Sequence, residues 1–173
     1  MAGKDPVAER MLSGGEATAI PWSEVLERFL EEGSTYWLAT VRPDGRPHVV
    51  PFGPALSDGA FYFTTGQGTR KGHNLAGNPN CVITFAVRGL DVAIEGTAAR
   101  VTDKETLERV AEVYRTVNGW PATVQGEGFD APFSAPTTGP APYDVYEVTP
   151  TIAYAFGTEE GNVYRSTRYR FQK

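Results

Sequence analysis

The hydrophobic residues of this chain fall mostly in short runs separated by Gly, Pro, Asp and Asn, a pattern typical of antiparallel strands joined by turns. Turns at 42–46 and 57–59 are short enough to make the first three strands a meander. The pattern predicts about seven strands, at Tyr36–Val41, Pro47–Ala55, Ala60–Thr65, Cys81–Val87, Asp91–Val101, Tyr143–Tyr154 and Val163–Phe171, with a turn at Gly157–Gly161 before the last. We expect a mostly β fold, either a closed or nearly closed barrel or an open α+β sheet.

Three segments show helical spacing instead. The first, Pro21–Glu32, begins with a proline, places Val25, Phe29 and Leu30 on one face and ends before Gly33. The second covers Arg70–Ala76 and stops before Asn78-Pro79. The third follows the capping-box pattern 102–105, and its apolar stripe is expected in the core, at Leu107, Val110, Ala111 and Tyr114.

The remaining segments set the domain organisation. Residues 1–20 lack any period and predict a flexible N-terminal arm, followed by a single domain over 21–173. Within it, 118–142 is a long loop rich in Gly, Pro, Thr and Ala, which indicates a lid or a binding loop. Its aromatic residues Trp120, Phe129 and Phe133 argue against full disorder.

The stretch Phe61–Leu75 predicts a strand, a glycine-bearing turn and then a helix that opens with Thr69, Arg70 and Lys71. Unpaired N–H groups and a partial positive charge make a helix N-terminus a natural seat for an anion. Arg70 and Lys71 add a planar fork and a point charge. We therefore expect a phosphate group to bind here; the alternative is an ordinary helix cap with two solvated cations.

Composition narrows the function classes. The net charge of −5 over 173 residues argues against a general nucleic-acid binder. A single cysteine excludes an intramolecular disulfide, and with two histidines it leaves no Cys/His metal site. The chain has no apolar run long enough to span a membrane and no signal-peptide order, so we expect a cytoplasmic protein that binds no membrane.

No catalytic residue can be named from the sequence. Hydrolase, P-loop and dinucleotide fingerprints are absent. Tyr62, His48 and His73 are candidates for a proton donor, although structural or surface roles explain each of them more simply. Cys81, at a strand start, is expected to be a buried thiol.

A second candidate surface borders the anion seat. In a barrel, Val49, Val50, Pro51 and Phe52 lie beside the strand that carries Thr64 and Thr65. Pro51 interrupts its ladder of hydrogen bonds, so neighbouring backbone groups are available to the polar edge of a flat heterocycle. The alternative is that Pro51 only marks a sheet edge.

Three segments carry a family resemblance: "WLATVRPDGRPHVVPF", "FYFTTGQGTRKGHNLAGNPNCVITF" and "VAIEGTAARVTD". Together they resemble the pyridoxamine 5′-phosphate oxidase-like FMN-binding split-barrel superfamily, and within it the actinobacterial flavin- or deazaflavin-dependent oxidoreductases. The resemblance runs from about Thr35 to Phe171, and its most specific part is Thr69–Leu75 with Asn78-Pro79. The C-terminal signature of true pyridoxamine phosphate oxidases is incomplete, which puts a vitamin-B6 substrate in doubt.

The resemblance implies an antiparallel split β-barrel of about six or seven strands with a few short helices, forming a homodimer with cofactor sites at the subunit interface. It implies an oxidoreductase that binds coenzyme F-420 or FMN by its phosphate and transfers hydride to or from a small organic substrate. The alternatives are a non-catalytic flavin- or tetrapyrrole-binding carrier and a protein that senses flavin or stress. The implied cofactor-binding residues are Val49, Val50, Pro51, Phe52, Thr64, Thr65, Thr69, Arg70, Lys71, Asn74 and Arg168.

Overall fold

The computed structural model describes residues 6–11, 18–29, 31, 34–134, 137–158 and 165–172. Some residues named above therefore lie outside the described part of the chain: Leu30, Gly33, the turn residues 159–161, the beginning of the last strand at 163–164, and 1–5 and 12–17 of the expected arm.

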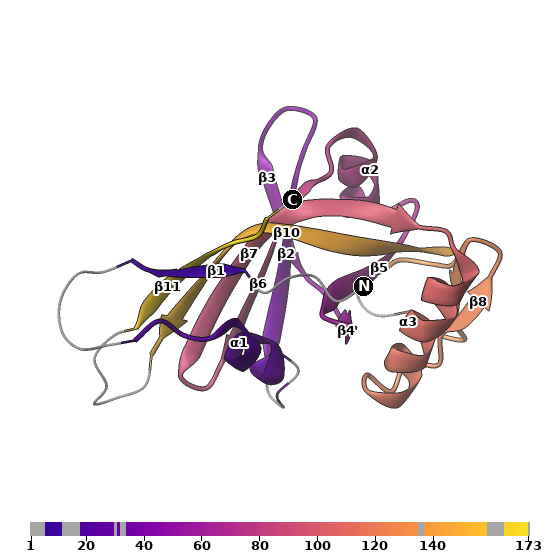
Figure 1. The fold of residues 1–173 in the computed structure, drawn as a ribbon. Helices are drawn as coiled ribbons and strands as arrows, with labels where there is room; N and C mark the ends of the chain where they lie inside the picture. The colour runs from indigo at the N-terminus through magenta and orange to yellow at the C-terminus, as the bar shows by residue number, and fades with distance from the viewer. Residues whose placement is uncertain are drawn as a thin grey trace.

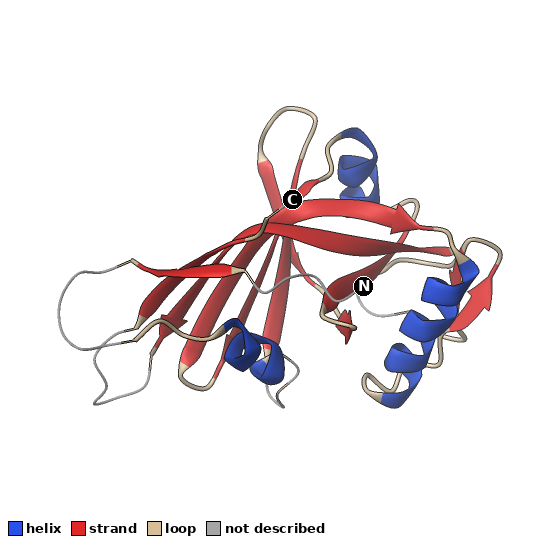
Figure 2. Cartoon of the chain, viewed as in Figure 1, coloured by secondary structure: helices blue, strands red, loops and turns tan. Residues whose placement is uncertain are grey.

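Antiparallel strands make up most of the described chain, which confirms the predicted mostly β class (Figure 2). The strands are β1 Val7–Arg10, β2 Thr35–Val41, β3 Pro47–Pro51, β4 Pro54–Ser57, β5 Ala60–Gly66, β6 Asn80–Val87, β7 Leu90–Val101, β8 Thr123–Gln125, β9 Gly128–Asp130, β10 Tyr143–Gly157 and β11 Ser166–Arg170. The helices are α1 Trp22–Arg28, α2 Arg70–Gly77 and α3 Lys104–Thr116.

The long strand β10 connects the two parts of the sheet. It pairs with β7 on one side; on the other, 143–148 pair with β5 and 152–156 pair with β11. From β7 the order continues through β6 and β2 to β3. Among the described strands β3 pairs only with β2, and β4 only with β5. No hydrogen-bonded ladder therefore joins β3 to β4, and only the chain connection between them bridges this gap in the barrel. The barrel is therefore split.

The sequence pattern misses the smaller strands. The predicted return strand Pro47–Ala55 is two strands, broken at Phe52-Gly53, where the Phe52 N–H donates to the Tyr36 carbonyl at 3.2 Å. The segment 118–142 holds the β8–β9 hairpin. Within the segment predicted as an arm, 7–10 form β1, which pairs with β11.

Two hydrophobic clusters pack against this sheet, whose strands and helices are traced in Figure 1. The first fills the barrel and includes α1, whose Phe29 ring lies 4.9 Å from Phe61 and 5.0 Å from Phe85. The second lies between α3, the β8–β9 hairpin and the β5–β10 pair, at the end of the molecule away from β1 and β11. It contains the predicted stripe Leu107, Val110, Ala111 and Tyr114, which confirms that this stripe is core.

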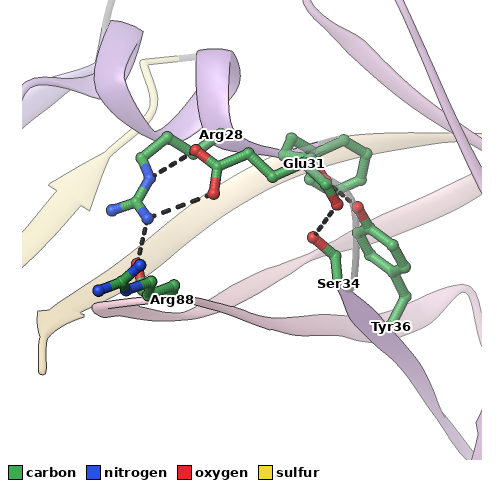
Figure 3. Close-up of polar contacts among 6 residues, drawn as sticks. Arg28, Glu31, Ser34, Tyr36 and Arg88 are labelled. Atoms are coloured by element: carbon green, nitrogen blue, oxygen red, sulfur yellow. Dashed lines mark hydrogen bonds and ion pairs between the residues drawn. The ribbon is translucent and has the colours of Figure 1, made fainter.

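Polar contacts fix the C-terminal end of α1, as Figure 3 shows. Arg28 donates to Glu31 at 3.0 Å and to the carbonyl of Arg88, which ties the helix to the β6–β7 turn. Ser34 donates to the Glu31 carbonyl at 2.6 Å, and the Tyr36 hydroxyl donates to the carbonyl of Phe29. These bonds hold the helix at the barrel and leave it no evident role in chemistry.

Two kinds of feature are absent from the described residues. Among them, no helix combines the length and apolar character that a membrane span requires. The same residues contain no group of three or more His, Cys, Asp or Glu side chains placed to hold a metal ion.

Candidate functional site

The turn between β5 and α2 depends on glycine at position 66. The Gly66 N–H donates to the Thr138 carbonyl at 2.6 Å. A Cβ at Gly66 would lie 2.6 Å from the Pro140 carbonyl oxygen and 2.8 Å from that of Thr138, which is closer than real Cβ atoms approach. The absence of a side chain therefore lets the segment 137–140 lie directly against the start of the turn.

Thr69 caps α2 as the sequence predicts. Its hydroxyl donates to the Gly66 carbonyl at 2.9 Å, accepts from the Gly72 N–H at 3.2 Å, and lies 2.6 Å from the Thr65 hydroxyl. The next two backbone N–H groups, of Arg70 and Lys71, donate no hydrogen bond within the described part of the chain. Two donors at a helix N-terminus thus remain available to an anion.

Lys71 is the unusual cation of this site. Its side chain is on the inner face of α2, the residue is 2% exposed, and its amino group donates to the carbonyl of Thr137. Burial lowers the pKa of Lys71 to about 8, because the apolar surroundings disfavour its charged form. Arg70, in contrast, is exposed and has no ion pair with any described residue. One cation is therefore held in place while the other is free to reach a ligand.

A buried polar group beside Lys71 lacks a partner. Asn74 is 1% exposed, and its Nδ2 donates to the Thr40 hydroxyl of β2 at 3.0 Å. Its Oδ1 is buried and has no hydrogen-bond partner among the described residues. If the amide oxygen and nitrogen are exchanged, the group without a partner is an N–H instead. A buried polar atom without a partner is uncommon and marks a position that a polar ligand atom can satisfy.

His48 lies near three positively charged side chains, a cluster that the sequence does not predict. Its Nδ1 lies 3.5 Å from the Thr40 hydroxyl. The pKa of His48 is lowered, first by burial and then by the positive charges of Arg42, Lys71 and Arg70. Arg42 belongs to the β2–β3 turn, where an arginine is easily taken for a solvated surface residue. Only the pairing of β2 with β3, and the contact of α2 with β2, bring it to this site.

The predicted stretch 49–52 divides between two faces of the sheet. Val49 is 53% exposed and pairs with Ala39, while Pro51 pairs with Trp37, on the outer face. Val50 pairs with the buried Leu38 and so faces the barrel. The Phe52 ring lies 6.0 Å from that of Phe63, packed on the barrel core. The outer-face side chains of Val49 and Pro51 are therefore available to a ring, whereas the Phe52 N–H is taken by the Tyr36 carbonyl and only its own carbonyl is on offer.

Thr64 and Thr65 are both buried, on opposite faces of β5. Thr65 contacts the helix cap, as described above, and Thr64 contacts the hydroxyl of Tyr114 on α3. The structure thus brings Thr65, Thr69, Arg70, Lys71 and Asn74 together around one helix N-terminus.

Arg168 does not join this group within one chain. It lies on β11, near the other end of the strand order from β3, and is bound by Glu9 of β1 at 2.6 Å. Its guanidinium lowers the pKa of the Glu9 carboxyl.

The remaining titratable candidates lie elsewhere. Tyr62 donates to Glu147 at 3.2 Å on the side of β5 that faces α3, and burial raises the pKa of its phenol. His73 is exposed, with its Nδ1 2.8 Å from the Thr69 carbonyl. Cys81 is buried, which confirms the prediction, and burial raises its pKa to about 12. These positions give the seat no acid or base beyond Lys71 and His48 among the described residues.

Comparison with curated proteins gives partial matches. A pyridoxine/pyridoxamine 5′-phosphate oxidase of Bacteroides thetaiotaomicron is 39% identical over 88 residues, covering 49% of this chain and 41% of the relative. One of Pseudomonas entomophila is 40% identical over 83 residues, covering 46% of this chain and 39% of the relative. The chain therefore spans about two fifths of the length of these relatives.

Solved structures match over more of the chain, at identities that show the fold alone. The conserved hypothetical protein Rv2991 of Mycobacterium tuberculosis has a TM-score of 0.63 at 18% identity, covering 88% of this chain and 97% of that one. An F-420 reductase has a TM-score of 0.52 at 22% identity, covering 73% and 94%. A pyridoxamine 5′-phosphate oxidase-related, FMN-binding protein of Nostoc punctiforme has a TM-score of 0.53 at 17% identity, covering 86% and 96%.

The family profile decides the assignment. The profile described as "Pyridoxamine 5′-phosphate oxidase" matches residues 23–155, which include the barrel strands β2–β7, α2 and the cap at Thr69. On this match, and on the split barrel that the strands form, the chain belongs to the pyridoxamine 5′-phosphate oxidase-like, FMN-binding split-barrel family.

Proposed function

We propose that this chain is a flavin- or deazaflavin-dependent oxidoreductase that holds coenzyme F-420 or FMN by a phosphate at the N-terminus of α2. The observation that carries the proposal is the group of donors at that position: the buried Lys71 amino group, which has one carbonyl partner, and the backbone N–H groups of Arg70 and Lys71, which donate no hydrogen bond among the described residues. Such donors fit an anion with several oxygen atoms. The bound cofactor supplies the hydride chemistry.

The residues of the chain position the cofactor. Lys71 and the two N–H groups would hold the phosphate, and the exposed Arg70 would close over it. The outer-face residues Val49 and Pro51 would border the ring system, with the backbone of Val50 and Phe52 between and beside them. Thr65 on β5 would border the phosphate beside Thr69, and Thr64, on the opposite face of the strand, would support it from behind.

Charge around the seat favours the deazaflavin. The tail of coenzyme F-420 carries carboxylates in addition to its phosphodiester, whereas FMN ends in a single phosphate. Three cations act on His48: Arg70 and Lys71 of α2, and Arg42 in the β2–β3 turn. Positive charge spread from the helix to the turn suits an elongated acidic tail better than a compact phosphate.

We further propose a homodimer built on the outer face of the sheet. Pairing registers place Trp37, Thr84, Ala93, Tyr154 and Arg168 in one row across β2, β6, β7, β10 and β11. Trp37 is 43% exposed, and Pro51 continues the row on β3. A two-fold axis through this face would bring Arg168 of one protomer toward the Val49–Pro51 edge of the other. That arrangement gives Arg168 the cofactor contact that one chain alone does not provide.

The test is a titration of both cofactors into the purified chain and three variants. Arg70→Ala and Lys71→Ala should each weaken binding of the preferred cofactor at least tenfold, because a hydrogen bond to a charged group contributes roughly 1.5–3 kcal/mol. Lys104→Ala, which removes an exposed cation at the start of α3, should leave the affinity unchanged. Equal affinity in all four proteins would rule out the phosphate seat.

Turnover then separates an enzyme from a carrier. With the preferred cofactor in its reduced form, steady-state oxidation of that cofactor by an organic acceptor, dependent on the protein, is expected of an oxidoreductase. Tight binding without any turnover across a panel of acceptors would favour the non-catalytic carrier.

A further inference from the structure

A cavity of about 270 Å³ opens beside Thr64, at the end of the molecule that carries α3. Its wall combines the corner between β3 and β4 with α3 and the segment that follows it. The lining residues on which the argument depends are Gly53, Thr64, Tyr114, Asn118, Trp120 and Phe133. We call this space the aromatic chamber.

Hydrogen bonds fix the side chains of the aromatic chamber. The Tyr114 hydroxyl donates to the Gly53 carbonyl at 3.0 Å, and Asn118 Nδ2 donates to the Pro54 carbonyl at 3.0 Å. The Trp120 indole N–H donates to the Phe133 carbonyl at 2.9 Å. The Tyr114 and Trp120 rings meet edge to face at 5.3 Å. The wall is thus held in place before any ligand arrives, which lowers the entropic cost of binding.

The lining sets the polarity of the ligand. None of the residues that line the chamber is charged. Burial raises the pKa of the Tyr114 phenol, which shows the low polarity of its surroundings. A charged ligand would lose its hydration here without gaining a counter-ion. The aromatic residues Trp120 and Phe133 in the lining favour flat rings, and the Asn118 amide and Thr64 hydroxyl can accept or donate a hydrogen bond.

Size and position separate the chamber from the cofactor seat. A volume of about 270 Å³ lies just below the usual range of small-molecule pockets and is too small for a complete flavin nucleotide. The chamber nevertheless adjoins the seat: Thr138 of its lining accepts the hydrogen bond from Gly66, and Gly53 of its lining directly follows the stretch 49–52. A molecule in the chamber would therefore lie next to whatever the seat positions.

We propose that the aromatic chamber is the substrate site and takes an uncharged, planar compound of one or two fused rings with a single hydrogen-bonding group. The role as a substrate site rests on the proposed function, whereas the binding of a neutral ring does not. Phe133, which is 57% exposed at the rim, is the residue that sets the preference for flat rings.

The test uses two probes of nearly equal shape, neutral 2-naphthol and anionic 2-naphthoate, titrated by calorimetry into the full chain with and without saturating cofactor. We expect 2-naphthol to bind at least tenfold more tightly than 2-naphthoate in both conditions. Phe133→Ala should weaken 2-naphthol about tenfold. Gly53→Leu should abolish its binding by filling the chamber, since a Cβ at Gly53 meets no atom within 4 Å. Met11→Ala, an exposed apolar residue elsewhere, should change nothing.

Three results would overturn the proposal: no binding of 2-naphthol in either condition, equal binding of the two probes, or loss of 2-naphthol affinity in proportion to added cofactor. The last result would assign the chamber to the cofactor ring. Cofactor binding, read in the same titrations, reports separately on the proposed function. Binding of 2-naphthol that depends on Phe133, without any cofactor affinity, would support the neutral-ring site and refute the oxidoreductase.

Discussion

At the scale of single residues, Lys71 is a buried cation whose pKa lies well below its ordinary value. A lysine that is 2% exposed, with one carbonyl as partner, is costly to keep charged. Its pKa of about 8 expresses this cost. An anion placed beside it would favour the charged form and raise the pKa toward its ordinary value. At pH values between about 8 and the ordinary pKa of a lysine, the complex would therefore bind more protons than the free protein.

This difference predicts how affinity depends on pH. Because the complex holds the extra proton, affinity for the preferred cofactor should be constant below about pH 7.5 and fall above about pH 8, by at most tenfold per pH unit. Stability of the free protein should change in the opposite direction: the unfolded chain keeps the Lys71 proton to a higher pH, so stability rises as pH passes 8. Calorimetry between pH 7 and 9.5, in two buffers of different ionisation enthalpy, measures the affinity and the proton uptake.

Lys71→Met provides the control for that experiment. It should bind the cofactor weakly and without the loss of affinity above pH 8, while Lys104→Ala should retain the wild-type profile. An affinity that stays flat from pH 7 to 9.5 in the wild-type chain would show that Lys71 does not contact the anion.

At the scale of elements, the β5–α2 turn and the segment 137–140 form one unit. Gly66 touches the carbonyls of both Thr138 and Pro140, and Lys71 donates to the Thr137 carbonyl. Thr137 in turn donates from its hydroxyl to the Pro51 carbonyl at 2.7 Å. The end of the long loop thus connects the anion seat to the ring-bordering edge of β3, and a disturbance of the turn should reach both.

Gly66→Ala is the variant that tests this connection. Its Cβ would press on two backbone carbonyls, so the segment 137–140 must move away from Lys71. We expect a loss of about 1–3 kcal/mol in the free energy of unfolding, typical of overpacking, together with weaker cofactor binding. The matched control is Gly68→Ala in the same turn, where a Cβ meets no atom within 4 Å. Chemical denaturation and cofactor titration measure both effects; equal behaviour of the two variants would contradict the coupling.

The sequence predicts features that depend on residues close together in the chain and misses features that depend on residues far apart. Alternation, turn residues and the cap at Thr69 are local signals, and they located the barrel strands and α2. The β8–β9 hairpin was missed because its strands are three residues each and lack a period. Arg42 and Thr40 join the seat, and Thr137 covers Lys71, through tertiary contacts for which the chain has no local signal. The division of 49–52 between two faces required the register with β2.

At the scale of the whole molecule, the outer face of the sheet differs from an ordinary solvated surface. Trp37, Val49 and Phe156 are 43%, 53% and 37% exposed. A hollow of about 340 Å³ lies on the same face, lined in part by Ala39, Val82 and Glu95. Apolar side chains that line one sheet face, rather than standing singly, mark an interaction surface. Val49 and Pro51, which we propose to border the ring, belong to this face, so a partner bound here would complete the proposed cofactor site.

Trp37→Glu tests that view directly. A charge placed at Trp37 on this face would be buried without a partner in a dimer, and such a charge costs several kcal/mol. We expect the variant to be a folded monomer by light scattering, with cofactor affinity reduced at least tenfold because Arg168 and the partner's edge no longer meet. Val117→Glu, 57% exposed after α3, controls for the added charge and should remain dimeric. A Trp37→Glu monomer that binds cofactor with full affinity would place the whole site within one chain and leave Arg168 no part in it.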